Sequence, residues 1–245
     1  MVSSEETGVS PSAAARPEPD VERSPGAERR PDVDAKVEVQ ARSKPGRSAA
    51  KPRGRPRSFD RATALEKALM AFWEHGYEAT SVSDLTRVMD IGTPSLYAAF
   101  GDKRSLFEEV VREYGAKYGS FGDRALAEEP TARAAIERML HEAAVEYTVP
   151  GRPHGCLVIH AATNCSTPEV EESLRERRNA NIAAFESRIA ADVAAGVLPP
   201  DTDAAALARH AGAMIQGMSQ QARDGASREE LKALAEIAMS IWPRS

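Results

Sequence analysis

Hydroxyl side chains are concentrated at the starts of two short predicted helices between residues 81 and 103. Ser81 and Ser83 open the first helix, and Thr93 and Ser95 open the second. Hydroxyls beside the free N–H groups of a helix N-terminus can donate hydrogen bonds to a phosphate, and they can also reach the edges of bases. The spacing therefore indicates a surface that binds a polyanion.

Two longer side chains extend this predicted surface. Tyr97 lies one turn along the second short helix, and Lys103 begins the next helix, where its ammonium group could hold another phosphate. Pro94 stands in the first turn of its helix, where a missing N–H costs little. Leu96 and Phe100 are predicted to face inward and to hold this helix against the rest of the domain.

The flanking sequence predicts the helices that would position these residues. A helix over residues 60–75 places four apolar side chains on one face and ends at Gly76. These side chains are Leu65, Leu69, Phe72 and Trp73. Ser81 and Asp84 form a weak capping box, and Asp90 can adopt the left-handed conformation that ends a helix. Another helix follows from Lys103, with Leu106, Phe107, Val110, Val111 and Tyr114 on one face.

Two short helices joined by a three-residue turn and braced by a longer helix form a helix-turn-helix, although spacing alone also fits a plain helical hairpin. In a helix-turn-helix, the first short helix crosses the DNA backbone and the second lies in the major groove. The segments AFWEHGYEATSVSDL (71–85) and IGTPSLYAAFGDKRSL (91–106) resemble the DNA-binding domain of the tetracycline-repressor (TetR) family. The resemblance covers residues 59–106.

This resemblance implies an all-α dimer with a three-helix DNA-binding domain and a larger C-terminal domain that holds a ligand pocket. Most members of the family repress, and ligand binding spreads the two reading heads so that the operator is released. By the resemblance, Tyr97 and Lys103 contact phosphates, and Thr93, Ser95 and Ala98 face bases. The alanine at 98 departs from the bulkier polar residues common there, and alanine cannot form bidentate hydrogen bonds with a base.

A basic segment precedes this domain. Seven of the 32 basic residues and no acid lie between residues 42 and 57, which leaves 25 basic against 37 acidic residues in the rest of the chain. The segment 51–57, KPRGRPR, resembles an AT-hook core. We expect Arg53 and Arg55 to enter an A·T-rich minor groove, with a nonspecific phosphate tether as the alternative. The composition of residues 1–57 predicts a disordered arm.

The remainder of the chain predicts only helices, near residues 131–147, 154–164, 168–195, 203–222 and 227–242. A small-molecule pocket is expected between them. Its candidate lining residues are Met139, Tyr147, Cys156, His160, Phe185, Met214 and Met218. Ordinary core packing is the alternative for each of these side chains.

His154, Cys156 and His160 also invite a metal interpretation, because imidazole and thiolate suit Zn or Cu. No fourth ligand fits the pattern, so we expect no metal and no cofactor. Redox sensing by Cys156 and Cys165 is an equally weak prediction. On a shared helix the two thiols would lie on opposite faces and too far apart to bridge.

The last two helices are predicted to form a homodimer as a four-helix bundle. Small residues allow close approach on one helix, and the other carries an apolar stripe. The predicted interface comprises Ala208, Ala211, Gly212, Ile215, Leu231, Leu234, Ile237, Ala238 and Ile241.

The sequence contains no Gly-rich phosphate loop and no nucleophile or metalloprotease motif, so no catalytic residue is predicted. It also lacks a secretory signal and an apolar run long enough to span a membrane, and its two cysteines imply no disulfide framework. We therefore expect a cytoplasmic, ligand-responsive regulator that binds double-stranded operator DNA. The alternative is an architectural protein that binds A·T-rich DNA through its arm.

Three domains follow from these patterns. Residues 1–57 form the basic arm, residues 58–119 form the helix-turn-helix domain and connecting helix, and residues 120–245 form the ligand-binding and dimerisation domain. The DNA-binding domain itself carries seven basic and ten acidic residues. This balance assigns part of the attraction for DNA to the arm.

Overall fold

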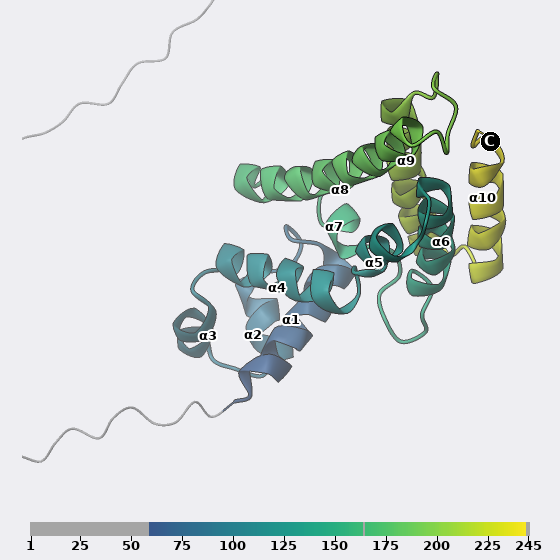
Figure 1. The fold of residues 1–245 in the computed structure, drawn as a ribbon. Coiled ribbons are helices and arrows are strands. Elements are labelled where there is room, and N and C mark those ends of the chain that lie inside the picture. Colours follow the sequence, from purple (N-terminus) through teal and green to yellow (C-terminus); the bar gives the residue numbers. More distant parts are fainter. Residues whose placement is uncertain (1–58, 164, 244–245) are drawn as a thin grey trace, which may run out of the picture. The chain divides into compact units, whose positions relative to one another are not determined.

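A computed structural model describes residues 59–163 and 165–243 (Figure 1). The regular elements of this part of the chain are all helices, as predicted. They are α1 (Arg61–His75), α2 (Val82–Met89), α3 (Thr93–Phe100), α4 (Lys103–Lys117), α5 (Phe121–Glu128), α6 (Ala132–Glu146), α7 (Leu157–His160), α8 (Pro168–Ala194), α9 (Ala204–Arg223) and α10 (Arg228–Ser240). The arm, including Arg53 and Arg55, lies outside the described residues.

Local capping fixes the boundaries of the first helices. Ser81 and Asp84 form the predicted capping box at the start of α2. Gly76 ends α1 with φ +78°, and Asp90 ends α2 in the left-handed conformation with φ 56° and ψ 48°. A short polar side chain tolerates this conformation better than a bulky one does, which explains how aspartate serves in the turn.

The predicted apolar faces of α1 and α4 form one core. The four α1 residues and the five α4 residues expected to face inward are all buried. Phe72 packs edge-to-face on Phe107 with ring centres 5.1 Å apart, and Trp73 packs on Tyr114 at 4.9 Å. Leu96 of α3 is fully buried against the same core. The helix carrying the predicted DNA contacts is thus fixed to its supports.

The prediction of one helix over residues 154–164 is wrong. The structure contains only the four-residue α7 there, flanked by turns. Gly155 explains the late start, because its φ is +74° and a Cβ atom would lie 2.5 Å from the carbonyl oxygen of Ser219. The chain passes too close to α9 for any side chain at this position. The short helix α5 was not predicted.

Helix α8 joins two apolar clusters. Its first half contributes Val170 and Leu174 to the core formed by α1–α4 and α7. Its second half contributes Phe185 and Ile189 to the core formed mainly by α5, α6, α9 and α10. At 27 residues, the helix is about 40 Å long. A single rigid element therefore spans both cores.

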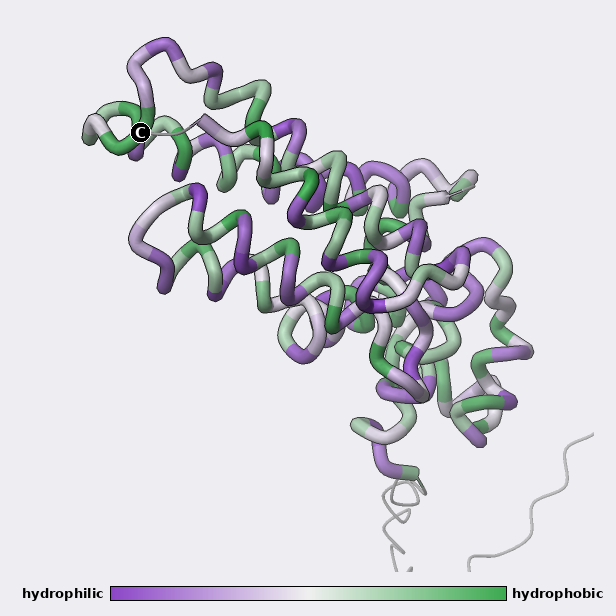
Figure 2. Tube along the Cα trace, turned by 90° about the vertical axis from the view of Figure 1, so that its right-hand side faces the viewer, coloured by the Kyte–Doolittle hydropathy of each residue, from purple (hydrophilic) through white to green (hydrophobic). Residues whose placement is uncertain are grey.

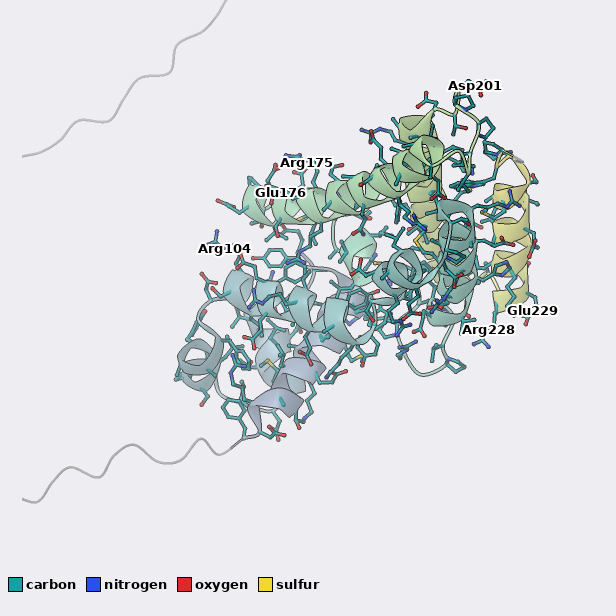
Figure 3. All side chains as sticks on the ribbon, viewed as in Figure 1. Arg104, Arg175, Glu176, Asp201, Arg228 and Glu229 are labelled. Atoms are coloured by element: carbon teal, nitrogen blue, oxygen red, sulfur yellow. The ribbon has the colours of Figure 1, made fainter. Side chains whose placement is uncertain are left out.

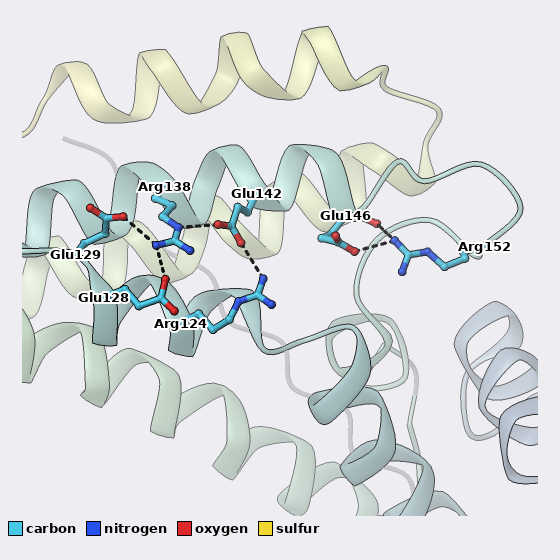
Figure 4. A network of polar contacts seen from close by, with 7 residues as sticks. All are labelled: Arg124, Glu128, Glu129, Arg138, Glu142, Glu146 and Arg152. Atoms are coloured by element: carbon cyan, nitrogen blue, oxygen red, sulfur yellow. Dashed lines mark hydrogen bonds and ion pairs between the residues drawn. The ribbon is translucent and has the colours of Figure 1, made fainter. Parts of the chain in front are cut away.

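Polar contacts on α6 and α8 hold the second cluster together. Arg138 of α6 binds the carboxylates of Glu128, Glu129 and Glu142 at 2.7–2.9 Å (Figure 4). These carboxylates, Glu142 foremost, raise the pKa of Arg138. On α8, buried Asp192 accepts a hydrogen bond from the Ala132 backbone N–H, and so ties α8 to the start of α6.

The predicted small-residue seam packs within the chain. Ala208, Ala211 and Gly212 of α9 are buried, and a Cβ atom at Gly212 would lie 3.0 Å from the Ile182 side chain of α8. On α10, Leu231 and Ala238 are also buried. These five predicted interface residues were therefore misassigned, because one protomer already covers them. The close helix approach at Gly212 is between α8 and α9 of the same chain.

Other predicted interface residues lie outside the buried core. Ile237 and Ile241 of α10 are 68% and 59% exposed, whereas Ile215 and Leu234 are partly buried. Hydrophilic and hydrophobic residues alternate around the helices, as expected for amphipathic helices with one solvent-facing side (Figure 2). Within the described residues, no helix is both long enough and apolar enough to cross a membrane.

Candidate nucleic-acid interface and the cavity beside it

The predicted nucleic-acid contacts share one exposed surface on α2 and α3. Ser81 and Ser83 are exposed at the start of α2. On α3 the exposed residues are Thr93, Pro94, Ser95, Tyr97 and Ala98. Tyr97 is 49% exposed, which is unusual for an aromatic ring and leaves its hydroxyl free to reach a partner. Ser81 is the exception, because its hydroxyl already donates to Asp84.

Arg61, which the sequence analysis missed, anchors the end of α3. Its two terminal nitrogens donate to the carboxylate of Glu109 at 2.6 and 2.7 Å. One of them also donates to the Ala99 carbonyl at 3.3 Å, and the guanidinium carbon lies 4.4 Å from the centre of the Phe100 ring. Arg61 therefore joins α1, α3 and α4, and it fixes the angle at which α3 is displayed.

Lys103 is partly buried beside the loop that follows α1. Its ammonium nitrogen lies 4.1 Å from the centre of the Tyr77 ring, a cation–π geometry. Burial lowers the pKa of Lys103, and the charge of Glu78 acts in the opposite direction. The ring holds the lysine in place at the N-terminus of α4.

Glu78, in the loop between α1 and α2, connects this surface to α8. Its Oε1 atom accepts hydrogen bonds from the backbone N–H groups of Ser166 and Thr167 and from the Thr167 hydroxyl, at 2.8–2.9 Å. These contacts, the Thr167 hydroxyl foremost, lower the pKa of Glu78. Thr167 is the N-cap of α8, so one carboxylate joins the start of α8 to the loop that leads into α2.

A second polar contact between the two clusters comes from α9. Arg223 donates to the carbonyl oxygens of Trp73 and Glu74 at the end of α1, at 3.4 and 3.0 Å. A cation suits the negative end of a helix dipole. The Trp73 indole N–H donates to the carbonyl of Gly155 at 3.1 Å. The α1 C-terminus is therefore fixed to the segment before α7 and to α9.

A cavity of about 350 Å³ lies among α4, α5, α6, α7, α8 and α9. Its walls are mostly apolar, and a smaller number of polar residues interrupt them. The polar lining residues are Tyr114, Asp123, Tyr147, Cys156, Arg177, Arg178, Asn181 and Gln216. Cavities of this size and composition hold small organic molecules in many proteins.

The structure places four of the seven predicted pocket residues in the cavity wall, namely Met139, Tyr147, Cys156 and Phe185. The other three are not part of the lining. Met218 is fully buried in the core, Met214 packs partly buried against it, and His160 lies near Gly76 at the end of α1. Helical spacing marks these residues as inward-facing, but it does not separate a core position from a cavity wall.

The predicted metal alternative gains no geometric support within the described residues, where no three His, Cys, Asp or Glu side chains are grouped to hold an ion. His154 instead faces the carbonyl of Ala222 at 3.2 Å. Cys156 lines the cavity, and burial raises the pKa of its thiol. Cys165 lies beyond the end of α7, so no helix carries both cysteines.

Comparison with known proteins places these features in one group. The family model described as "Bacterial regulatory proteins, tetR family" matches residues 64–110. The HTH-type transcriptional repressor ComR of Escherichia coli K12 is 35% identical over 196 residues, which cover 79% of this chain and 93% of ComR.

Solved structures agree with this grouping. A cysteine mutant of the TetR-family regulator CifR, complexed with 26-bp double-strand operator DNA, aligns with a TM-score of 0.74 and 39% identity. The alignment covers 77% of this chain and all of CifR. A putative TetR regulator from Rhodococcus sp. RHA1 aligns with a TM-score of 0.54 and 38% identity, over 76% of this chain and all of that one.

Proposed function

This chain belongs to the TetR family of bacterial transcriptional regulators, and from that premise we propose that it is a homodimeric repressor released from its operator by a small molecule. The observation that carries this proposal is the arrangement of α8. This helix forms one wall of the cavity, and its N-cap is held by Glu78 in the loop before α2. A ligand that shifts α8 would therefore also act on the loop that leads into the DNA-reading helices α2 and α3.

We assign the DNA contacts to the exposed face of α2 and α3. Ser83 would bind phosphate at the start of α2, and Tyr97 and Lys103 would bind phosphates on either side of the major groove. Thr93 and Ser95 would read bases from the start of α3. Ala98 could touch a thymine methyl group.

Release requires that the ligand bind one arrangement of the protein more tightly than the other. The cavity is lined by α4 as well as α8, and α4 packs directly on α1 in the DNA-binding core. A ligand that is better accommodated when these helices separate would favour the arrangement in which the two DNA-reading heads of a dimer no longer match the operator.

The dimer is proposed to form through the exposed faces of α9 and α10. Ile237 of α10 and Ile241, the C-cap of α10, are four positions apart, and they are the two most exposed of the large hydrophobic side chains in the described residues. Changing both isoleucines to glutamate should give a monomer in light scattering at micromolar concentration. Val197→Glu, at an exposed position outside α9 and α10, is the matched control and should stay dimeric. A wild-type monomer would contradict the assignment.

We further propose the domain division given by the sequence, with an arm over 1–57, a DNA-binding domain over 58–119 and a ligand-binding and dimerisation domain over 120–245. The protein would act in the cytoplasm on chromosomal DNA, as a regulator rather than a catalyst. The arm would add phosphate or minor-groove contacts through Arg53 and Arg55. Removing residues 1–57 should weaken binding and reduce its salt dependence.

The testing experiment is DNase footprinting on the promoter beside the protein's own gene, at two salt concentrations. The proposal expects a discrete, nearly palindromic footprint that requires more protein when Tyr97→Ala or Lys103→Ala is introduced. Diffuse protection of A·T-rich DNA, insensitive to these substitutions and lost with the arm, would instead support the architectural alternative.

A further inference from the structure

The cavity wall contains one buried polar atom without a partner. Five buried side-chain nitrogen or oxygen atoms lack a hydrogen-bond partner within the described residues, and only the Nη1 atom of Arg178 belongs to a cavity-lining residue. A buried guanidinium N–H without an acceptor is costly, because desolvation is not offset by a hydrogen bond. Burial accordingly lowers the pKa of Arg178.

The charged residues near Arg178 form no ion pair with it within the described part of the chain. Arg175 and Glu171, both on α8, bind each other with nitrogen and oxygen 3.5 Å apart, and Arg175 also binds Glu172. Within the cavity lining, the other charged residues are Asp123 of α5 and Arg177 of α8, and both are exposed. No ion pair joins Asp123 to Arg178 among the described residues. Arg178 is half-buried, its Nη1 atom is buried without a hydrogen-bond partner, and no ion pair within the described residues compensates its charge.

The rest of the wall determines the shape of a matching ligand. The apolar side chains include Val111, Leu126, Met139, Ile182, Phe185 and Ile215. The amides of Asn181 and Gln216 and the Tyr114 hydroxyl supply further polar groups. The Arg178 guanidinium neutralises one negative charge. The lining also contains the exposed Arg177, but the exposed Asp123 carries the opposite charge, so a second negative charge on the ligand would gain no buried partner. A carboxylate attached to an apolar body satisfies both parts of the wall.

We propose that the cavity binds an organic monoanion, an amphipathic carboxylate, whose charged end pairs with Arg178 and whose body packs on the apolar wall. The inference rests on the proposed function, that a ligand enters this cavity and releases DNA. Arg178 lies on α8, and Glu78 binds the N-cap residue of this helix. The carboxylate would therefore act on the helix that contacts the DNA-binding domain.

The test uses the full-length dimer and ligands that differ only in their polar end. Octanoate and 4-phenylbutyrate are compared with their amides, with the corresponding amines and with octyl phosphate. Calorimetry measures affinity, and fluorescence anisotropy measures release of the operator. We expect each carboxylate to bind about tenfold or more tightly than its amide, and to release DNA at correspondingly lower concentration.

Arg178→Gln should reduce the ratio of carboxylate to amide affinity to about one, whereas Arg178→Lys should retain part of it. Arg104→Gln is the matched control, because Arg104 is an exposed arginine at the start of α4 outside the cavity lining (Figure 3), and it should leave the ratio unchanged. Thermal denaturation establishes that each variant is folded. The wild-type comparison of carboxylate and amide tests the inference even if Arg178→Gln fails to fold.

The outcomes separate the inference from the function on which it rests. Release of DNA by amides or amines at the same concentrations as carboxylates would overturn the inference that the ligand is anionic. The proposal that a small molecule releases the repressor would stand. If octyl phosphate bound more tightly than octanoate, the inference that the ligand carries a single negative charge would be overturned. A carboxylate preference that survives Arg178→Gln would overturn the role of Arg178. Absence of binding and release by every compound would overturn the inference, whereas the DNA-binding function is tested separately by the footprint.

Discussion

The two apolar clusters of this protein present their functional groups in opposite ways. The DNA-binding cluster displays hydroxyls outward from α3 on a frame whose own polar groups are paired, as with Arg61 and Glu109. The cavity cluster directs its polar groups inward and leaves the Arg178 guanidinium without a full set of partners. A DNA-reading surface needs a fixed geometry, whereas a sensor needs a group whose interactions are completed only when a ligand arrives.

Polar contacts at helix ends join the two clusters, in addition to the apolar packing of α8 on both cores. Glu78 holds the start of α8, and Arg223 holds the end of α1. Each contact joins a side chain to backbone groups at a helix terminus, where unpaired N–H or C=O groups are available. These hydrogen bonds are separate from the apolar packing of α8, so they can change while both cores remain packed. The following predictions test this division, from the largest expected effect to the smallest.

Gly155→Ala should have the largest effect. The substitution combines the strain of a positive φ with a Cβ atom 2.5 Å from the Ser219 carbonyl, and should lower the free energy of unfolding by about 3 kcal/mol or more. Gly151→Ala is the matched control, because φ there is +79° with no atom within 4 Å, so only the strain of about 1 kcal/mol remains. Urea denaturation of both variants measures the difference. Equal losses would show that α9 does not restrict this junction.

Arg61→Met should weaken the DNA-binding cluster next. Loss of the paired hydrogen bonds to Glu109 should cost about 1–2 kcal/mol, discounted for partial exposure of the pair. Operator affinity should fall as well, because α3 loses its anchor at the Ala99 carbonyl. Urea denaturation and anisotropy with operator DNA provide the two measurements, and ligand affinity should not change. A parallel loss of ligand affinity would show that the two clusters are not separable.

Lys103→Met should reduce operator affinity by about tenfold and make the slope of log affinity against log salt shallower by about one, as for one lost phosphate contact. Stability should change little, because the methylenes can still pack on Tyr77. Lys67→Met, an exposed lysine of α1 outside the proposed contacts, is the control and should leave the slope as in the wild type. A wild-type slope for Lys103→Met would remove this residue from the interface.

Glu78→Gln should have only a small effect on stability, lowering Tm by about 2 °C at neutral pH. The Thr167 hydroxyl and two backbone N–H groups lower the pKa of Glu78 in the folded state. The stabilisation is therefore present above the unfolded pKa near 4.5, and it is lost as pH falls through the lower folded pKa. The difference in Tm between wild type and variant should accordingly shrink below about pH 4.5.

The same variant tests the coupling between the clusters. Glu78→Gln should retain ligand binding but require more ligand to release DNA, because the start of α8 is held less firmly to the loop before α2. Calorimetry and anisotropy on one preparation separate the two quantities. An unchanged ligand requirement for release would show that coupling passes through α4 or α9 instead.

The sequence by itself determined the DNA-binding half of the protein. Helix boundaries there depend on neighbours within a few residues, such as the capping box of Ser81 and Asp84 and the left-handed Asp90, so local sequence is sufficient. The spacing of apolar residues in α1 and α4 identified the buried faces of these helices. In α3, Leu96 and Phe100 are four positions apart, and this spacing identified the side that packs on the core.

Tertiary structure alone decided the rest. The short length of α7 follows from the approach of Gly155 to α9, a contact between residues 64 positions apart that no local pattern records. The same is true of Met139, which lines the cavity, and Met218, which does not, although both are inward-facing on their helices. Arg61, Glu78, Arg178 and Arg223 escaped prediction for the same reason. Charged residues are usually solvated, and only the position of groups distant in the sequence distinguishes these four.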